Sequence, residues 1–459
     1  MFKASRRRKQ FLLFLVDIVL LTISIPIALF LRSGNIPSIH SVLIHLTYFS
    51  PTIVFWIIVM YTFEFYMLEN LFDGLTSTVK LIGVALLSLL FSMGSFYLLF
   101  SNILTPKRIM ALYITVAFIL IFLWRYLYNL LYLTVKTSPN VLFIGYNNTV
   151  GDLIPQLMEA SYCRYEPVAI FDDNFNKSVL PNKCKSAVLK SVQELNEFIK
   201  HNKIDIIVLG HDHALNNDVR KLLFSFLGQS KSIYSLSTFY EIATRKLPLG
   251  ALNDTWVLSH INLHTKRLYF IVKRAVGFIF ATLFFLIFLP FFLIVAIIIK
   301  LESKGPVFFT QIREGKDSKP FSILKFRTMK IDNNDFKPTT KNDSRITRVG
   351  KFLRKTRIDE IPQMINIIKG DMALIGPRPE RPEIAVNLES SIPFYRQRLL
   401  VKPGITGWDQ VSGEYHSPSI EDTIKKMQYD LFYVKNVSLF LDVSIFFKTI
   451  TTMFKRSGQ

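Results

Sequence analysis

Five long apolar runs constrain the fold of this chain more than any other feature of its sequence. Four of them lie at about residues 11–31, 43–63, 79–100 and 111–133, and the fifth covers residues 276–300. A helix of about 20 apolar residues is long enough to cross the hydrocarbon core of a bilayer. The sequence therefore predicts a membrane protein with a four-helix transmembrane domain over residues 1–135.

The composition agrees with this prediction and adds a strong positive charge. Hydrophobic residues make up 50% of the 459 residues, and the formal net charge is +21. The mean hydropathy of +0.31 is high for a soluble protein. A basic surface favours anionic partners. We expect the basic residues to bind membrane lipids and phosphate groups. We do not expect a nucleic acid as a partner.

Residues 139–250 alternate β-branched runs with helical patterns, which indicates a Rossmann-like α/β domain, followed by a linker at 251–266. The turn after VLFIG begins like a dinucleotide fingerprint, but Asn147 and Val150 stand where its later glycines belong. A non-catalytic domain is therefore favoured over a dinucleotide site. The HDH stretch at 211–213 reads as a polar loop rather than a metal pair, because no third ligand has suitable spacing.

The fifth apolar run contains a proline near its middle. Pro290 removes a helix hydrogen bond and bends the helix axis. A bent segment can enter and leave the same leaflet when its broken backbone is covered by protein. The alternative is a kinked helix that crosses the membrane.

A dense group of cations precedes two adjacent carboxylates in RKTRIDEIPQMINIIKG. Apolar residues at helical spacing, Pro362 and Gly370 predict a helix that begins just after Asp359 and Glu360. A helix N-terminus favours the ionised form of a carboxylate, which could then act as a nucleophile or metal ligand. The alternative is that Asp359 only caps the helix.

Arginines near these carboxylates suggest phosphate chemistry. Arg354 and Arg357 can share a pocket with Asp359, and Arg378 is held between Pro377 and Pro379. Guanidinium groups bind phosphates in bidentate fashion. A neighbouring carboxylate can hold Mg²⁺ or attack phosphorus.

From about residue 267 to 453 the sequence resembles the bacterial sugar transferase family, the polyprenyl-phosphate hexose-1-phosphate transferases. The likeness rests on GPVFFTQIREG, KFRTM, the stretch from RKTRIDE to GPRPE, VKPGITGW, and the pattern from Asp430 to Asp442. The N-terminal helices with a Rossmann-like domain are similar to the large, multidomain branch of exopolysaccharide-type undecaprenyl-phosphate glycosylphosphotransferases.

The resemblance implies a sugar-phosphate transferase domain over residues 267–459. This mixed α/β catalytic domain would carry a re-entrant helix hairpin at 276–300 that breaks at Pro290, and an interfacial C-terminal helix. Apolar and polar residues alternate in that last helix, for which core packing is the alternative.

The resemblance also implies a reaction and roles for the site residues. Hexose-1-phosphate would move from a UDP-hexose, with glucose or galactose favoured, to undecaprenyl phosphate through a phospho-aspartyl intermediate, with release of UMP. Asp359 would be the nucleophile and Glu360 a metal ligand or base, and both would bind Mg²⁺. The implied phosphate-binding residues are Arg354, Arg378, Lys325, Arg327 and Arg357.

The implied setting is the cytoplasmic side of the bacterial inner membrane, where UDP-sugars occur. The product would initiate exopolysaccharide, capsule or O-antigen assembly, and the family suggests a homodimer. An N-acetylhexosamine-1-phosphate donor is one alternative, and a membrane-anchored regulatory or scaffold protein with an inactive transferase domain is another. A transporter is disfavoured, because the spans lack paired intramembrane charges beyond Asp17, Glu64 and Arg125.

Overall fold

The computed structural model describes residues 2–63, 65–66, 74–99, 107–133, 138–158, 165–172, 186–210, 216–226, 231–330, 343, 345–412 and 419–456. The chain divides into two compact units, Met1–Ser235 and Leu236–Gln459. The HDH stretch at 211–213 and Glu64 lie outside the described residues.

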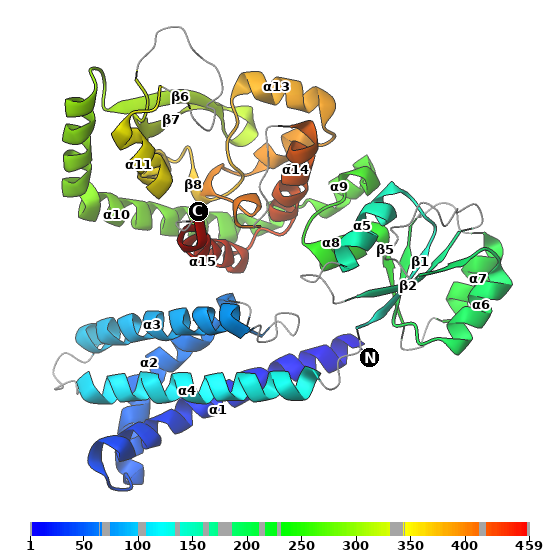
Figure 1. Cartoon of the computed structure of the whole chain (residues 1–459), viewed down its shortest axis with the longest axis horizontal. Coiled ribbons are helices and arrows are strands. Elements are labelled where there is room, and N and C mark those ends of the chain that lie inside the picture. The colour runs from blue at the N-terminus through cyan, green and yellow to red at the C-terminus, as the bar shows by residue number, and fades with distance from the viewer. Residues whose placement is uncertain are drawn as a thin grey trace. The chain divides into compact units, whose positions relative to one another are not determined.

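Four long helices in the first unit share one apolar core (Figure 1). They are α1 (Phe2–Ser33), α2 (Ile39–Thr62), α3 (Gly74–Leu99) and α4 (Lys107–Leu133). Each contributes a fully buried side chain, namely Leu21, Trp56, Leu81 and Tyr113. Together with the segment that ends in α10 of the second unit, they are the five described helices that are long and apolar enough to cross a membrane.

An ion pair joins α1 to α4 inside this core. Arg125 Nη2 lies 2.5 Å from Asp17 Oδ2, and Arg125 Nη1 donates a hydrogen bond of 3.0 Å to the Phe65 carbonyl. Both charged side chains are buried. A lone charge in an apolar environment is costly, so the pair favours one arrangement of the two helices.

The α/β part of the first unit is a five-stranded parallel sheet in the order β3-β2-β1-β4-β5. Its strands are β1 (Asn140–Ile144), β2 (Glu166–Phe171), β3 (Ala187–Leu189), β4 (Ile206–Leu209) and β5 (Ser232–Ser235). In Figure 1, α5 (Asn148–Met158) covers one face, and α6 (Val192–His201) and α7 (Asn217–Ser225) cover the other. The Rossmann-like prediction is confirmed.

The Asn147 side chain lies between the ends of two central strands of this sheet. Its Nδ2 donates to the Gly210 carbonyl at 3.0 Å, and its Oδ1 accepts from the Val150 amide at 2.8 Å. The side chain therefore bridges the ends of β1 and β4, where the strand order reverses and such sheets usually bind ligands.

The second unit is a mixed α/β structure built on two small sheets, antiparallel β6/β7 and parallel β8/β9. Its strands are β6 (Phe308–Glu314), β7 (Pro320–Phe326), β8 (Ala373–Ile375) and β9 (Gly404–Thr406). Its helices are α8 (Leu236–Thr244), α9 (Asp254–His260), α10 (Arg267–Glu302), α11 (Arg348–Thr356), α12 (Gln363–Lys369), α13 (Pro382–Ser391), α14 (Ile420–Lys435) and α15 (Leu439–Arg456). Residues 236–250 belong to this unit, and the Leu247 amide donates to the Gln428 carbonyl at 3.1 Å.

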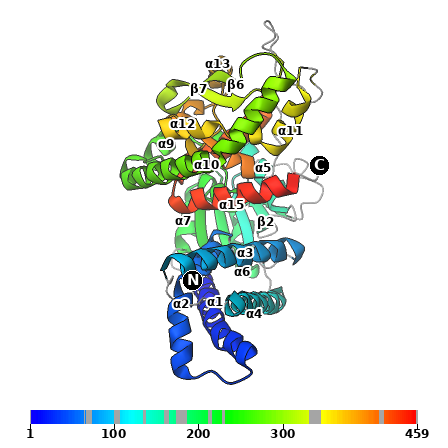
Figure 2. The same ribbon diagram turned by 90° about the vertical axis from the view of Figure 1, so that its left-hand side faces the viewer.

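Helix α10 consists of two arms that meet at a sharp bend, visible in Figures 1 and 2. Pro290 is the proline inside this helix and accounts for the bend. The buried residues of α10 are Gly277, Ala281, Phe292, Val295 and Ile299. Much of the remaining surface is apolar and open, as at Leu268 and Ile287, which are 73% and 71% exposed. Such a continuous apolar surface is typical of contact with a membrane.

Helix α15 has one buried face and one open face. Ile445 is fully buried in a cluster with Trp408 and Tyr433, whereas Leu439 and Val443 are 44% and 39% exposed. The helix therefore packs on its own unit and still presents apolar side chains outward.

Candidate active site

The two carboxylates lie on a short turn between α11 and α12. Arg357 ends α11 in the left-handed region, with φ 60°, and Asp359 and Glu360 follow in the 3-10 turn η5 (Ile358–Glu360). Helix α12 then runs to Gly370, whose φ of 98° caps it. The predicted helix is confirmed, and the carboxylates lie on the 3-10 turn just before it.

Helix α11 is fastened to the segment that follows β7. A Cβ at Gly350 would lie 2.0 Å from the Thr328 carbonyl oxygen, so only glycine allows this approach. The Thr347 amide donates to the same carbonyl at 3.1 Å. Arg354 Nε donates to Thr328 Oγ1 at 3.1 Å. These contacts orient Arg354 beside the turn that carries the carboxylates.

Glu360 is surrounded by cations. Its Oε1 accepts hydrogen bonds from Lys325 Nζ at 2.9 Å and Arg378 Nη2 at 2.8 Å, and Arg357 Nη1 lies 3.6 Å from its Oε2. Burial alone would raise the pKa of this carboxyl, but the charges of Arg378 and Lys325 hold the pKa well below its usual range. Glu360 is therefore ionised and fixed in position.

Asp359 is equally buried but differently bonded. It is 8% exposed, like Glu360. Within the described part of the chain, no hydrogen bond or ion pair engages its carboxylate. Burial and then the neighbouring Glu360 charge raise its pKa, while Lys325, Arg354 and Arg357 oppose this rise. Burial therefore works against the ionised form that a helix N-terminus favours. The carboxylate oxygens remain available for a substrate or cation.

The structure brings four of the five predicted phosphate-binding cations close to the carboxylates. They are Lys325, Arg354, Arg357 and Arg378. Arg327 is the exception. Its guanidinium donates to the Ser303 carbonyl at 2.7 Å and to the Lys304 carbonyl at 3.0 Å, at the end of α10. Strand β7 ends at Phe326, so the chain turns away and the alternation that would align Arg327 with Lys325 stops.

A second cluster, which the sequence does not reveal, ties α10 to α15. Asp442 pairs with Lys273 at 2.9 Å and accepts hydrogen bonds from Tyr269 at 2.9 Å and Tyr433 at 2.7 Å. Arg274 donates to the Ile367 and Ile368 carbonyls at the end of α12. Asp442 belongs to the sequence motifs described above. The partners of these residues become clear only from the fold.

The two carboxylates are candidate ligands for Mg²⁺. Among the described residues, no group of three or more His, Cys, Asp and Glu side chains could hold a metal ion. Magnesium commonly uses one or two carboxylates together with substrate phosphates. Asp359 fits this arrangement, whereas Glu360 Oε1 is already bound by two cations.

Comparison with known proteins adds independent findings. The bacterial sugar transferase model matches residues 268–456, and a CoA-binding domain model matches residues 19–234. The chain is 41% identical over 228 residues to UDP-N-acetylgalactosamine-undecaprenyl-phosphate N-acetylgalactosaminephosphotransferase of Aeromonas hydrophila. That alignment covers 49% of this chain and 53% of the relative, so the chain spans about half of the relative's length.

Two further relatives differ in how much of their length is matched. UDP-glucose:undecaprenyl-phosphate glucose-1-phosphate transferase of Escherichia coli K12 is 32% identical over 319 residues, which are 67% of this chain and 68% of the relative. Exopolysaccharide production protein PSS of Rhizobium leguminosarum is 38% identical over 194 residues, which are 40% of this chain but 96% of the relative.

Proposed function

The chain belongs to the bacterial sugar transferase family, and on this basis we propose that it transfers hexose-1-phosphate from a UDP-hexose to undecaprenyl phosphate. The observation that carries the proposal is the unengaged, buried Asp359 carboxylate beside a Glu360 that cations hold in place. Two relatives carry names with the same type of reaction and different sugars. Glucose or galactose is the proposed sugar, and an N-acetylhexosamine is the alternative.

The proposed reaction has two displacements at one phosphorus atom. An Asp359 carboxylate oxygen attacks the phosphorus bonded to the sugar, the bond from that phosphorus to the bridging oxygen breaks, and UMP leaves. An oxygen of undecaprenyl phosphate then attacks the same phosphorus and releases the carboxylate. The product is the undecaprenyl-diphosphate sugar. Dividing the transfer lets a water-soluble donor and a lipid acceptor use the site in turn.

The cations around Glu360 suit this chemistry. Phosphoryl transfer depends mainly on positioning and on stabilisation of negative charge. The Arg378 side chain is 35% exposed, so part of its guanidinium remains open to phosphate oxygens while it binds Glu360. Arg354 and Lys325 supply further positive charge near Asp359. Bound Mg²⁺, with Asp359 as its protein ligand, would neutralise the donor diphosphate.

The proposed setting is the cytoplasmic side of the bacterial inner membrane. The bent, apolar α10 supports a re-entrant hairpin, because such a hairpin keeps both ends of the helix on one side of the bilayer. A UDP-sugar donor from the cytoplasm supports a site on that side of the membrane. The product would initiate exopolysaccharide, capsule or O-antigen synthesis, and the homodimer is proposed from the resemblance alone.

The test combines the purified protein with undecaprenyl phosphate, Mg²⁺ and a panel of UDP-sugars, with UMP release as the measurement. We expect Asp359→Asn to lose at least about a thousandfold in rate, because the nucleophile is removed. Asp317→Asn is the matched control, since Asp317 is exposed and its φ of 55° suits asparagine.

Two results would contradict the proposal. Asp359→Asn activity within tenfold of the parent would place the nucleophile elsewhere. Absence of UMP release with every donor would instead favour the alternative of a scaffold protein with an inactive transferase domain.

A further inference from the structure

The segment that carries Arg378 is held by its carbonyl oxygens. Four successive carbonyls accept hydrogen bonds from four different donors. Pro377 O accepts from the Gly404 amide at 3.1 Å, Arg378 O from Arg398 Nη2 at 2.7 Å, Pro379 O from Arg313 Nη1 at 3.2 Å, and Glu380 O from the Glu314 amide at 2.9 Å. The contacts come from β9, from β6 and from the 3-10 turn η6 (Tyr395–Leu400).

This pattern follows from the sequence of the segment. Pro377 and Pro379 have no backbone N–H, so the segment has fewer donors with which to bind its surroundings. Its orientation therefore depends on what its carbonyls accept. The contact at Arg378 itself comes from the Arg398 side chain. Glu360 binds the Arg378 side chain, so Arg378 is held at both ends.

Arg398 is itself fixed by a buried carboxylate. Its Nε donates to Asp430 Oδ2 at 3.0 Å, and its Nη2 lies 2.8 Å from the same oxygen. Its Nη1 donates to Tyr395 OH at 3.1 Å. The Arg398 and Asp430 side chains are only 2% and 1% exposed. Burying an ion pair is costly and often adds no net stability, so a pair this deep fits a need for orientation.

We infer that Arg398, aligned by Asp430, is a positioning residue for Arg378 and thereby fixes the cation that binds Glu360. The inference rests on the proposed function for its link to turnover. It assigns Arg398 no contact with substrate.

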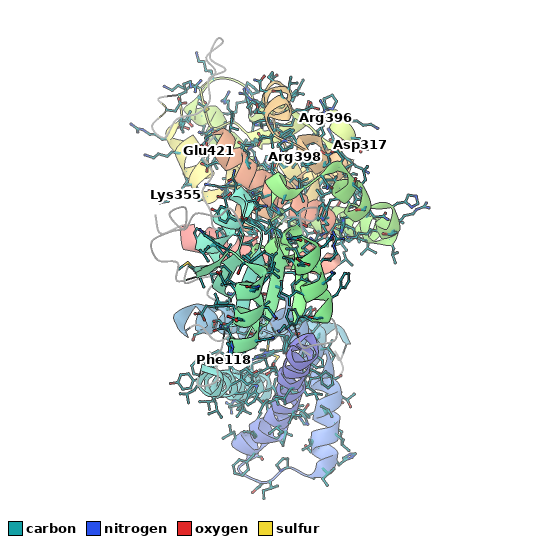
Figure 3. The ribbon with its side chains drawn as sticks, turned by 90° about the vertical axis from the view of Figure 1, so that its right-hand side faces the viewer. Phe118, Asp317, Lys355, Arg396, Arg398 and Glu421 are labelled. Atoms are coloured by element: carbon teal, nitrogen blue, oxygen red, sulfur yellow. The ribbon has the colours of Figure 1, made fainter. Side chains whose placement is uncertain are left out.

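The turn η6 provides a matched control two residues away. Arg396 pairs with Glu389 at 2.5 Å, and both side chains are largely exposed at 48% and 40%. Figure 3 labels Arg396 and Arg398 near one another in the second unit. Arg396→Lys changes the same residue type on the same turn without touching the Arg378 segment.

The experiment is a double-mutant cycle in the full-length protein, with Arg398→Lys, Arg378→Lys and the double variant. Lysine keeps the charge opposite Asp430 but cannot donate to Asp430, Tyr395 and the Arg378 carbonyl together. We expect Arg398→Lys to lower kcat for UMP release about tenfold or more, and Arg396→Lys to leave it unchanged. We also expect the double variant to be no slower than the slower single variant, because both changes disable the same cation.

The outcomes separate the inference from the proposed function. The inference would be overturned if the two losses in kcat multiply in the double variant. It would also be overturned if Arg398→Lys leaves kcat unchanged. If the parent releases no UMP, the proposed function fails. The same cycle is then measured by melting temperature. Independent sites give additive shifts in melting temperature, so additive shifts would overturn the inference. If Arg398→Lys does not fold, Tyr395→Phe takes its place, because it removes one acceptor from Arg398 and keeps the ion pair.

Discussion

At the scale of single residues, the two neighbouring carboxylates have opposite environments. Glu360 is bound by Lys325 and Arg378, which keep its pKa low despite burial. Asp359 is buried without such bonds among the described residues, and its pKa is raised. Adjacent carboxylates with diverging pKa values commonly have separate roles. Here one anchors the cations and the other is available to react.

This contrast predicts the pH dependence of UMP release. Asp359 must be ionised to attack, so activity falls as the pH drops through its raised pKa. Arg357 lowers that pKa, and its side chain is 49% exposed. Arg357→Gln should therefore raise the pKa of Asp359 further and move the acid limb of the pH–rate profile to higher pH. Lys355→Gln, at an exposed position two residues earlier, is the control. An unmoved acid limb in Arg357→Gln would contradict this assignment.

The left-handed backbone of Arg357 gives a prediction about stability. A residue with a Cβ pays about 1 kcal/mol or more at positive φ, whereas glycine does not. Arg357→Ala and Arg357→Gly both remove the weak ion pair to Glu360 at 3.6 Å. The glycine variant should therefore be more stable than the alanine variant by about 1 kcal/mol, measured by denaturant unfolding. Equal stabilities would show that Arg357 does not have the left-handed conformation in solution.

At the scale of elements, the sequence predicts those features that depend on local pattern. The four apolar helices, the parallel sheet, α12 and its Gly370 cap all follow from periodicity and turn chemistry. The left-handed turn at Arg357 does not, because neither glycine nor asparagine marks it. The separation of Arg327 from Lys325 depends on where β7 ends. Arg396 and Arg398 look equivalent in YRQRLL, and only packing shows that Arg398 is the buried one.

The bend in α10 leads to a prediction at this scale. Pro290 breaks the helix hydrogen bonding, so Pro290→Leu should favour a straighter helix that crosses the bilayer. Residues after Glu302 would then move to the opposite side of the membrane and lose access to the proposed cytoplasmic donor. We expect cysteine labelling of Asp317→Cys in spheroplasts to change from protected to reactive, with loss of UMP release.

Two controls accompany that prediction. Asp317→Cys in the parent background should retain UMP release and stay protected from the impermeant reagent. Pro382→Leu provides a proline change outside the membrane helix, at the start of α13. Unchanged labelling and activity in Pro290→Leu would mean that the bend does not set the topology.

At the scale of the whole molecule, the chain combines two units of different architecture. The second unit contains the carboxylates, the cations around them and the bent helix. The alignment with the Rhizobium relative covers 194 residues, which are 40% of this chain and 96% of the relative. That relative therefore has little sequence outside the matched region. The first unit has its own apolar core and a sheet in which the Asn147 side chain bridges the ends of β1 and β4. These features favour a supporting role for the first unit rather than a catalytic one.

The most direct measurement of the central claim is mass analysis of the intact site after reaction with donor alone. The purified protein would be mixed with Mg²⁺ and the active UDP-sugar without undecaprenyl phosphate, quenched with acid and digested. We predict a sugar-phosphate adduct on the peptide that contains Asp359, absent in Asp359→Asn and discharged when undecaprenyl phosphate is added. An adduct on a different residue, or active turnover without any adduct, would contradict the account.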